Sequence, residues 1–188
     1  MPYRWLFVGW AGIIGDVNQT SVSPSPADRP AFLSYAHKDL RLVRAVHGLL
    51  VPRLALGAAR KFSIWNDEQI LAGERWSGEI DKAIDRSDLA LLAISPDFLN
   101  SPFIRNVELK ALLGRRGKVV IPFMLEDVSF TRHELHGVDE MQVFQFLAPE
   151  WTERRSFRRT PQNRRADWAN RLVDEIHGRF EKLAEAGA

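Results

Sequence analysis

One carboxylate near the middle of the sequence stands where an acid could do chemistry. Residues 102–113 have the spacing of a helix that begins at Ser101-Pro102, a capping hydroxyl followed by proline at the first helical position. On this helix Glu108 lies four residues from both Ile104 and Leu112, so the three side chains share one strip of the surface. An acid among apolar side chains loses water, which raises its pKa and suits it to proton or cation chemistry.

Glu108 also has an ordinary interpretation as a surface residue of that helix. It would then pair with Arg105 or Lys110, or lie at the edge of the apolar strip with its carboxylate in water. Helical spacing alone does not decide between the chemical and the structural role.

Other kinds of site find little support in the sequence. The chain has no cysteine, which excludes disulfides, thiolate metal ligands and a thiol nucleophile. Ser34 lacks the neighbours of a catalytic triad, and the GxGxxG and P-loop patterns that hold nucleotide cofactors are absent. We therefore expect no bound cofactor. The five histidines form no convincing set of metal ligands, and we expect no metal: His37, His47, His133, His136 and His177.

The elements that must position these residues alternate between strands and helices. Apolar runs without polar alternation predict strands that are buried on both faces, as in a mostly parallel sheet covered by helices on both sides. Ligands of such sheets bind beyond the carboxyl ends of the strands, so the loops to inspect are 35–39, 66–76, 95–101 and 126–140. The predicted strands are 31–36, 62–65, 89–94, 119–125 and 143–147, and the predicted helices run from Asp39 to about Gly57, over 76–86, over 102–113 and over 163–183.

A length of 188 residues suits one folded domain, which we place at residues 29–188. Residues 1–28 are predicted to be a poorly ordered extension and linker, because 15–30 are rich in serine, proline and small polar residues. The apolar residues 1–14 could alternatively be a secretory signal or an anchor. No apolar run approaches the roughly 20 residues that cross a bilayer, so we expect no membrane partner and a cytoplasmic location.

Four segments together resemble the bacterial type of TIR (Toll/interleukin-1 receptor) domain, over residues 30–183. FLSYAHKD at 32–39 is similar to the family's first strand and the loop after it, and IWNDEQILAGERW at 64–76 to the second strand and its long loop. SDLALLAISPDFLNSPFIRNVELKALL at 87–113 resembles the third strand and its helix, and VVIPFML at 119–125 resembles the fourth strand.

The resemblance implies an α/β, flavodoxin-like fold with a parallel five-stranded sheet and helices on both faces. It also implies that Glu108, on the helix after the third strand, is the catalytic residue of an enzyme that cleaves NAD+ as its substrate. The substrate-binding residues that it implies lie in the loops after the first two strands and shortly before the glutamate: Ser34, Tyr35, Ala36, His37, Asp67, Trp76 and Phe103.

The favoured function is an NAD+ nucleosidase that breaks the nicotinamide–ribose bond, giving nicotinamide and ADP-ribose or a cyclic ADP-ribose, in signalling or defence. The resemblance implies self-association through TIR–TIR contacts, and allows other TIR-containing or sensor proteins as partners. Two alternatives stay open: a non-catalytic TIR–TIR interaction module, and a nucleoside-processing enzyme of similar fold.

Residues 153–165 contain six arginines and one glutamate, although the formal net charge of the chain is only +2. This basic patch has three interpretations: a surface for an anionic partner such as nucleic acid or a membrane, a rim that steers the phosphates of NAD+, or a solvated connection before the last helix. Few aromatic residues are interleaved with the arginines, so we do not expect a nucleic-acid partner.

Overall fold

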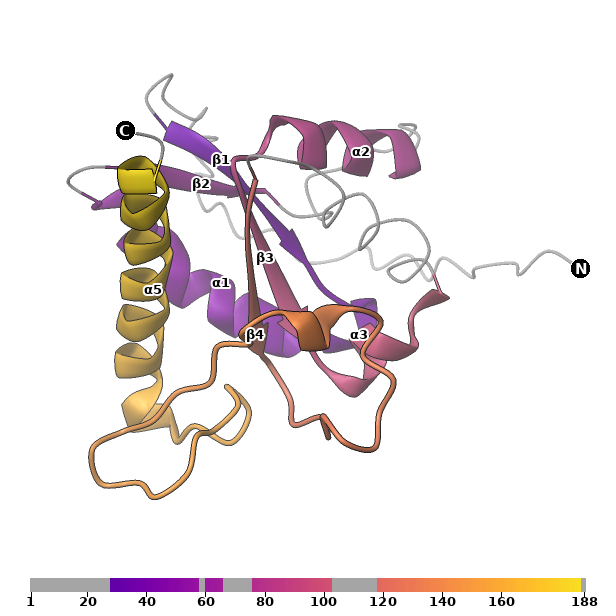
Figure 1. Cartoon of the computed structure of the whole chain (residues 1–188), viewed down its shortest axis with the longest axis vertical. Helices are drawn as coiled ribbons and strands as arrows, with labels where there is room; N and C mark the ends of the chain where they lie inside the picture. The colour runs from indigo at the N-terminus through magenta and orange to yellow at the C-terminus, as the bar shows by residue number, and fades with distance from the viewer. Residues whose placement is uncertain (1–27, 58–59, 66–75, 103–117, 187–188) are drawn as a thin grey trace, which may run out of the picture.

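The computed structural model describes residues 28–57, 60–65, 76–102 and 118–186 (Figure 1). Within these ranges, four strands alternate with helices along the chain. The elements are β1 (Asp28–Ser34), the 3-10 helix η1 (His37–Asp39), α1 (Leu40–Ala55), β2 (Lys61–Trp65), α2 (Trp76–Arg86), β3 (Leu89–Ile94), α3 (Pro96–Asn100), β4 (Val119–Met124), the 3-10 helices η4 (Val138–Glu140) and η5 (Gln162–Arg164), and α5 (Arg165–Ala186).

The four strands form one parallel sheet in the order β2-β1-β3-β4. β3 lies inside the sheet, and all six of its residues are buried. This burial explains why its sequence is a continuous apolar run rather than an alternating one. The predicted α/β class with a parallel, flavodoxin-like sheet is confirmed.

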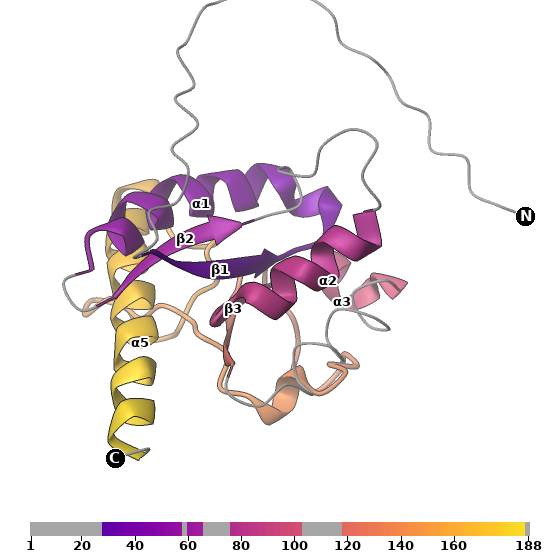
Figure 2. The same cartoon turned by 90° about the horizontal axis from the view of Figure 1, so that it is seen from above.

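Helices cover both faces of the sheet (Figures 1 and 2). Alternate residues of β3 point to opposite faces: Leu91 belongs to the same apolar cluster as α1 and α5, and Leu92 to the same cluster as α2 and α3. Leu50 of α1 is fully buried in the first cluster and Ile84 of α2 in the second. The sheet is therefore the middle layer of three.

The predicted fifth strand at 143–147 is not a full strand. It makes one parallel bridge, between Phe123 and Phe144, and one antiparallel bridge, between Phe146 and Arg155. Phe144 donates to the Pro122 carbonyl (N···O 2.8 Å) and its own carbonyl accepts from the Met124 N–H (N···O 2.9 Å), so the outward groups of β4 face this segment. Pro122 has no N–H to donate to this segment, which limits the number of backbone hydrogen bonds between the segment and β4.

Residues 95–101, expected to be a loop, contain the short helix α3. Ser95 caps it by accepting a hydrogen bond from the Phe98 N–H (2.9 Å), and Pro96 occupies its first position. The predicted helix 102–113 lies outside the described residues, apart from Pro102. The last helix begins two residues later and ends three residues later than the predicted range 163–183.

Candidate functional site

The candidate site lies at the edge of the sheet where its parallel strands end. From β1 the chain passes through α1 to β2 on one side, and from β2 through α2 to β3 on the other side of β1. The strand order therefore reverses between β1 and β3. In open α/β sheets, ligands bind outside the carboxyl ends of the strands at such a switch point.

The loop after β1 brings four of the predicted site residues together at this edge. Ser34 is the last residue of β1, and Ser34, Tyr35 and Ala36 are 2%, 9% and 6% exposed. His37, the first residue of η1, is exposed. Ser34, Tyr35 and Ala36 are therefore buried beneath the surface at this edge, and His37 is the one of the four whose side chain is exposed to solvent.

The other predicted site residues fall in or next to undescribed segments. Asp67, Phe103 and Glu108 lie outside the described residues. Trp76 is the first residue of α2, and its side chain lies outside the described part of the structure. The catalytic and substrate-binding assignments thus stay predictions.

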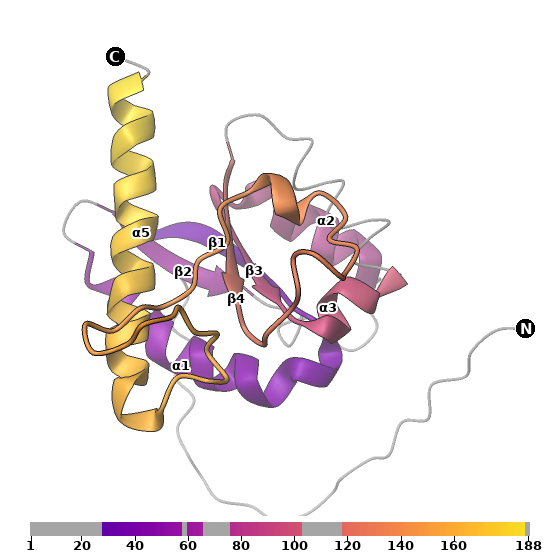
Figure 3. The same ribbon diagram turned by 60° about the horizontal axis from the view of Figure 1, so that its bottom comes forward.

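A buried polar pair, which sequence reasoning missed, connects the loops on the two sides of the switch point. The Ser95 hydroxyl donates to the Asp39 Oδ2 carboxylate oxygen, and both side chains are buried. Ser95 follows β3 and Asp39 ends η1, so the bond joins the β1 loop to the start of α3. Figure 3 shows α3 and the start of α1, which follows η1, at the same end of the sheet. In the sequence Asp39 was visible only as a helix-start residue, because nothing local indicates its distant partner.

The environment of Asp39 favours its protonated form. Burial is the main cause that raises its pKa, and the nearby negative charges of Glu126 and Asp97 act in the same direction. The Ser95 hydrogen bond and the positive charge of Arg158 oppose this shift.

Further charged groups form the rim of this edge. Lys38 Nζ lies 2.9 Å from Asp97 Oδ1 in an exposed ion pair, which raises the pKa of Lys38. Glu126 pairs with Arg158, and the Glu126 N–H donates to the Ile94 carbonyl (3.1 Å), fixing the end of β4 against the end of β3. The edge thus combines acids with compensating cations.

The arginines of the basic patch 153–165 contact other groups within the chain. Three form ion pairs with acids: Arg158 with Glu126, Arg159 with Glu153 (2.7 Å) and Asp127 (3.6 Å), and Arg164 with Glu150 (2.8 Å) and Asp167 (2.7 Å). The others contact rings or backbone: Arg155 lies 4.1 Å from the centre of the Trp151 ring, Arg165 lies 4.5 Å from that of Phe157, and Arg154 donates to the Gln145 carbonyl (3.3 Å). These contacts favour the interpretation of the patch as a connection before the last helix.

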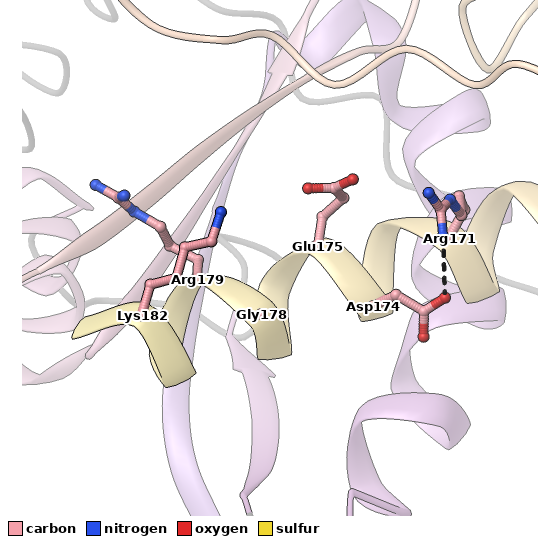
Figure 4. A pocket seen from close by; sticks show the side chains of 6 residues that line it. All are labelled: Arg171, Asp174, Glu175, Gly178, Arg179 and Lys182. Carbon is pink, nitrogen blue, oxygen red and sulfur yellow. Dashed lines mark ion pairs between the residues drawn. The ribbon is translucent and has the colours of Figure 1, made fainter. Parts of the chain in front are cut away.

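A shallow hollow of about 220 Å³ lies along α5 (Figure 4). All its lining residues come from this one helix, and the ion pair between Arg171 and Asp174 (3.9 Å) spans part of it. A wall built by one exposed helix cannot enclose a substrate, so we keep the candidate site at the sheet edge. The lining residues are Arg171, Asp174, Glu175, Gly178, Arg179 and Lys182.

Metal-binding clusters and membrane-spanning helices are absent from the described ranges. Within them, no three side chains of metal-binding type come together as a ligand group. None of the helices in those ranges is both long and apolar enough to span a bilayer.

Comparison with known proteins identifies the family. The "Uncharacterized protein y4lF" of Sinorhizobium fredii (strain NBRC 101917 / NGR234) is 31% identical over 97 residues, which are 50% of this chain and 29% of that protein. The chain therefore spans less than a third of that relative's length. The TIR domains of the activated Roq1 resistosome, solved in direct recognition of the pathogen effector XopQ, match with 22% identity and a TM-score of 0.43, over 52% of this chain and 57% of theirs. The family model of the TIR domain matches residues 31–159, more than half of the sequence, and the chain therefore belongs to the TIR domain family.

Proposed function

We propose that this TIR domain is an NAD+ nucleosidase that cleaves the nicotinamide–ribose bond, with Glu108 as its catalytic residue. The observation that carries the proposal is the switch point between β1 and β3. The β1 loop ends there, and the segment that contains Glu108 follows β3 and α3 in the chain. The family match over residues 31–159 includes both segments.

Cleavage of the nicotinamide–ribose bond mainly requires one carboxylate that the protein holds close to the ribose. Nicotinamide bound to ribose is already a cationic leaving group, and breaking the bond leaves an oxocarbenium-like positive charge on the sugar. A carboxylate held beneath the ring, away from water, stabilises that charge. Glu108 would supply the carboxylate, and the products would be nicotinamide and ADP-ribose or a cyclic ADP-ribose.

The test is nicotinamide release from NAD+ by the concentrated, purified chain, followed by chromatography. We expect Glu108→Gln to lower the rate at least about 100-fold, because glutamine keeps the shape of the side chain but not its charge. Glu181→Gln is the matched control, since Glu181 is an exposed glutamate on α5. If Glu108→Gln releases nicotinamide as fast as the parent chain, the catalytic assignment is wrong.

A non-catalytic TIR–TIR interaction module is the second candidate function. It is favoured by the burial of Ser34, Tyr35 and Ala36, which leaves His37 as the exposed side chain among the four predicted contacts of the β1 loop. A parent chain that self-associates but leaves NAD+ intact would establish this function in place of catalysis.

Signalling or defence is the biological setting we propose for either function. Self-association through TIR–TIR contacts, and contacts with other TIR-containing or sensor proteins, belong to the same proposal. So does a cytoplasmic location, for which the lack of cysteine in the sequence is compatible with a reducing compartment.

A further inference from the structure

The buried contact between Asp39 and Ser95 has a defined direction. Asp39 Oδ2 can accept a hydrogen bond whether or not the carboxyl group is protonated, and its donor is the Ser95 hydroxyl. Its oxygen keeps lone pairs free to accept, and it accepts from the Phe98 N–H at 2.9 Å. Asp39 therefore orients the hydroxyl that caps α3.

This chain of hydrogen bonds crosses the switch point. Asp39 is held in turn by its own N–H, which donates to the Ala36 carbonyl (2.8 Å) in the β1 loop. Ser95 directly follows the last residue of β3 and is fully buried. The two side chains thus join the loop after β1 to the first turn of α3.

We infer that Asp39 and Ser95 form a positioning pair that holds α3 in a fixed orientation against the β1 loop, and that NAD+ cleavage depends on this orientation. The inference rests on the proposed function. Neither residue is assigned a contact with substrate, since Asp39 and Ser95 are 6% and 0% exposed. Both act through the segments that they join.

A second connection between the same two elements supplies the control. Lys38 of η1 pairs with Asp97 of α3 at 2.9 Å, but the Lys38 side chain is 80% exposed. An exposed pair contributes little because water screens it. Lys38→Ala therefore removes an exposed connection between η1 and α3, and it is expected to leave the fold and the amide hydrogen exchange at Phe98 as they are.

Two measurements on Asp39→Ala, Ser95→Ala and the double variant test the pair. Amide hydrogen exchange at Phe98 is expected to quicken roughly tenfold in each, because the cap is lost or no longer oriented. Per folded molecule, kcat is expected to fall at least about tenfold with KM changed less than about twofold, and the double variant is expected to be no slower than the single ones.

Asp39→Asn tests whether the activity needs only the hydrogen bond from Ser95 or also the carboxyl group of Asp39. It also provides a test if the alanine variants do not fold. Its amide oxygen can still accept from Ser95, so we expect it to keep the Phe98 protection and most of the activity. The inference is overturned if Phe98 exchanges at the parent rate in the alanine variants, or if Asp39→Asn keeps that protection but loses activity. If the parent chain releases no nicotinamide from NAD+, the proposed function is wrong. The amide hydrogen exchange at Phe98 then still shows whether the Asp39–Ser95 pair holds α3.

Discussion

At the scale of single residues, Asp39 is the one buried charged side chain in the described part of the chain. Burying a carboxylate costs free energy unless hydrogen bonds and opposite charges compensate. Ser95 and Arg158 provide that compensation, whereas Glu126 and Asp97 work against it. The net effect is a raised pKa, so the native chain holds a proton on Asp39 more tightly than the unfolded chain does.

This shift predicts how Asp39→Asn changes the dependence of stability on pH. Because the native pKa is raised, the contribution of Asp39 to stability is greatest at low pH and is lost as the pH rises through the interval above the ordinary Asp value. Asparagine does not titrate, so the free energy of unfolding of the variant relative to the parent should rise between about pH 4 and pH 7. Urea unfolding across this range measures it.

Asp81→Asn, at an exposed position on α2, is the matched control for that series. A constant difference between Asp39→Asn and the parent at every pH would show that burial of Asp39 does not perturb its titration.

Sequence reasoning located the β1 loop but not the role of Asp39. The burial of residues 31–36 follows from an apolar run, which is local information. The burial of Asp39 depends on Ser95, which lies 56 residues further along the chain and comes close only because β1 and β3 are neighbours. A periodicity argument cannot find a contact of this kind.

At the scale of elements, prediction succeeded where a long apolar pattern decides the outcome. In α5 the residues Trp168, Leu172 and Ile176 recur at helical spacing and are all fully buried. α3 was not predicted because its five residues are too few to show a periodic pattern. The segment 143–147 was predicted as a full strand but makes only isolated bridges, because its neighbour β4 contains a proline that has no N–H to donate. The sequence of 143–147 itself does not show this property of its neighbour.

Trp168 is the anchor that holds α5 against the sheet. Its ring packs edge-on against three phenylalanines, with centroid distances of 5.6 Å to Phe123, 5.6 Å to Phe144 and 4.8 Å to Phe157. These rings come from β4 and from the segment that follows it, so one side chain joins three parts of the chain.

We expect Trp168→Ala to lower the free energy of unfolding by about 3–5 kcal/mol, since it empties a fully buried site. Trp168→Phe should cost less, because it keeps an aromatic ring and because the indole N–H that it removes has no hydrogen-bond partner among the described residues. Urea unfolding measures both, with Leu183→Ala as a control because Leu183 is 44% exposed on the same helix. Equal losses from Trp168→Ala and Leu183→Ala would contradict the anchoring role.

At the scale of the whole molecule, the sheet order determines where function can lie. One apolar cluster lies under α1 and α5, the other under α2 and α3, so both faces of the sheet are occupied. In the described part of the chain, the polar pair, the charged rim and His37 gather at the carboxyl ends of the strands, where ligands of open α/β sheets bind. The family could be predicted from the sequence because its four segments are these strands and the loops that follow them.

If neighbouring copies complete the site, as the proposed self-association implies, specific activity should depend on protein concentration. A dilution series that spans the midpoint of association, measured by sedimentation, should show nicotinamide release per molecule falling as the chain becomes monomeric, because each monomer then lacks the groups that its neighbour supplies. An inert carrier protein added to every dilution controls for loss on surfaces. Release per molecule that stays constant down to the monomer would mean that one chain carries a complete site, with the β1 loop, α3 and the segment after α3 sufficient for cleavage.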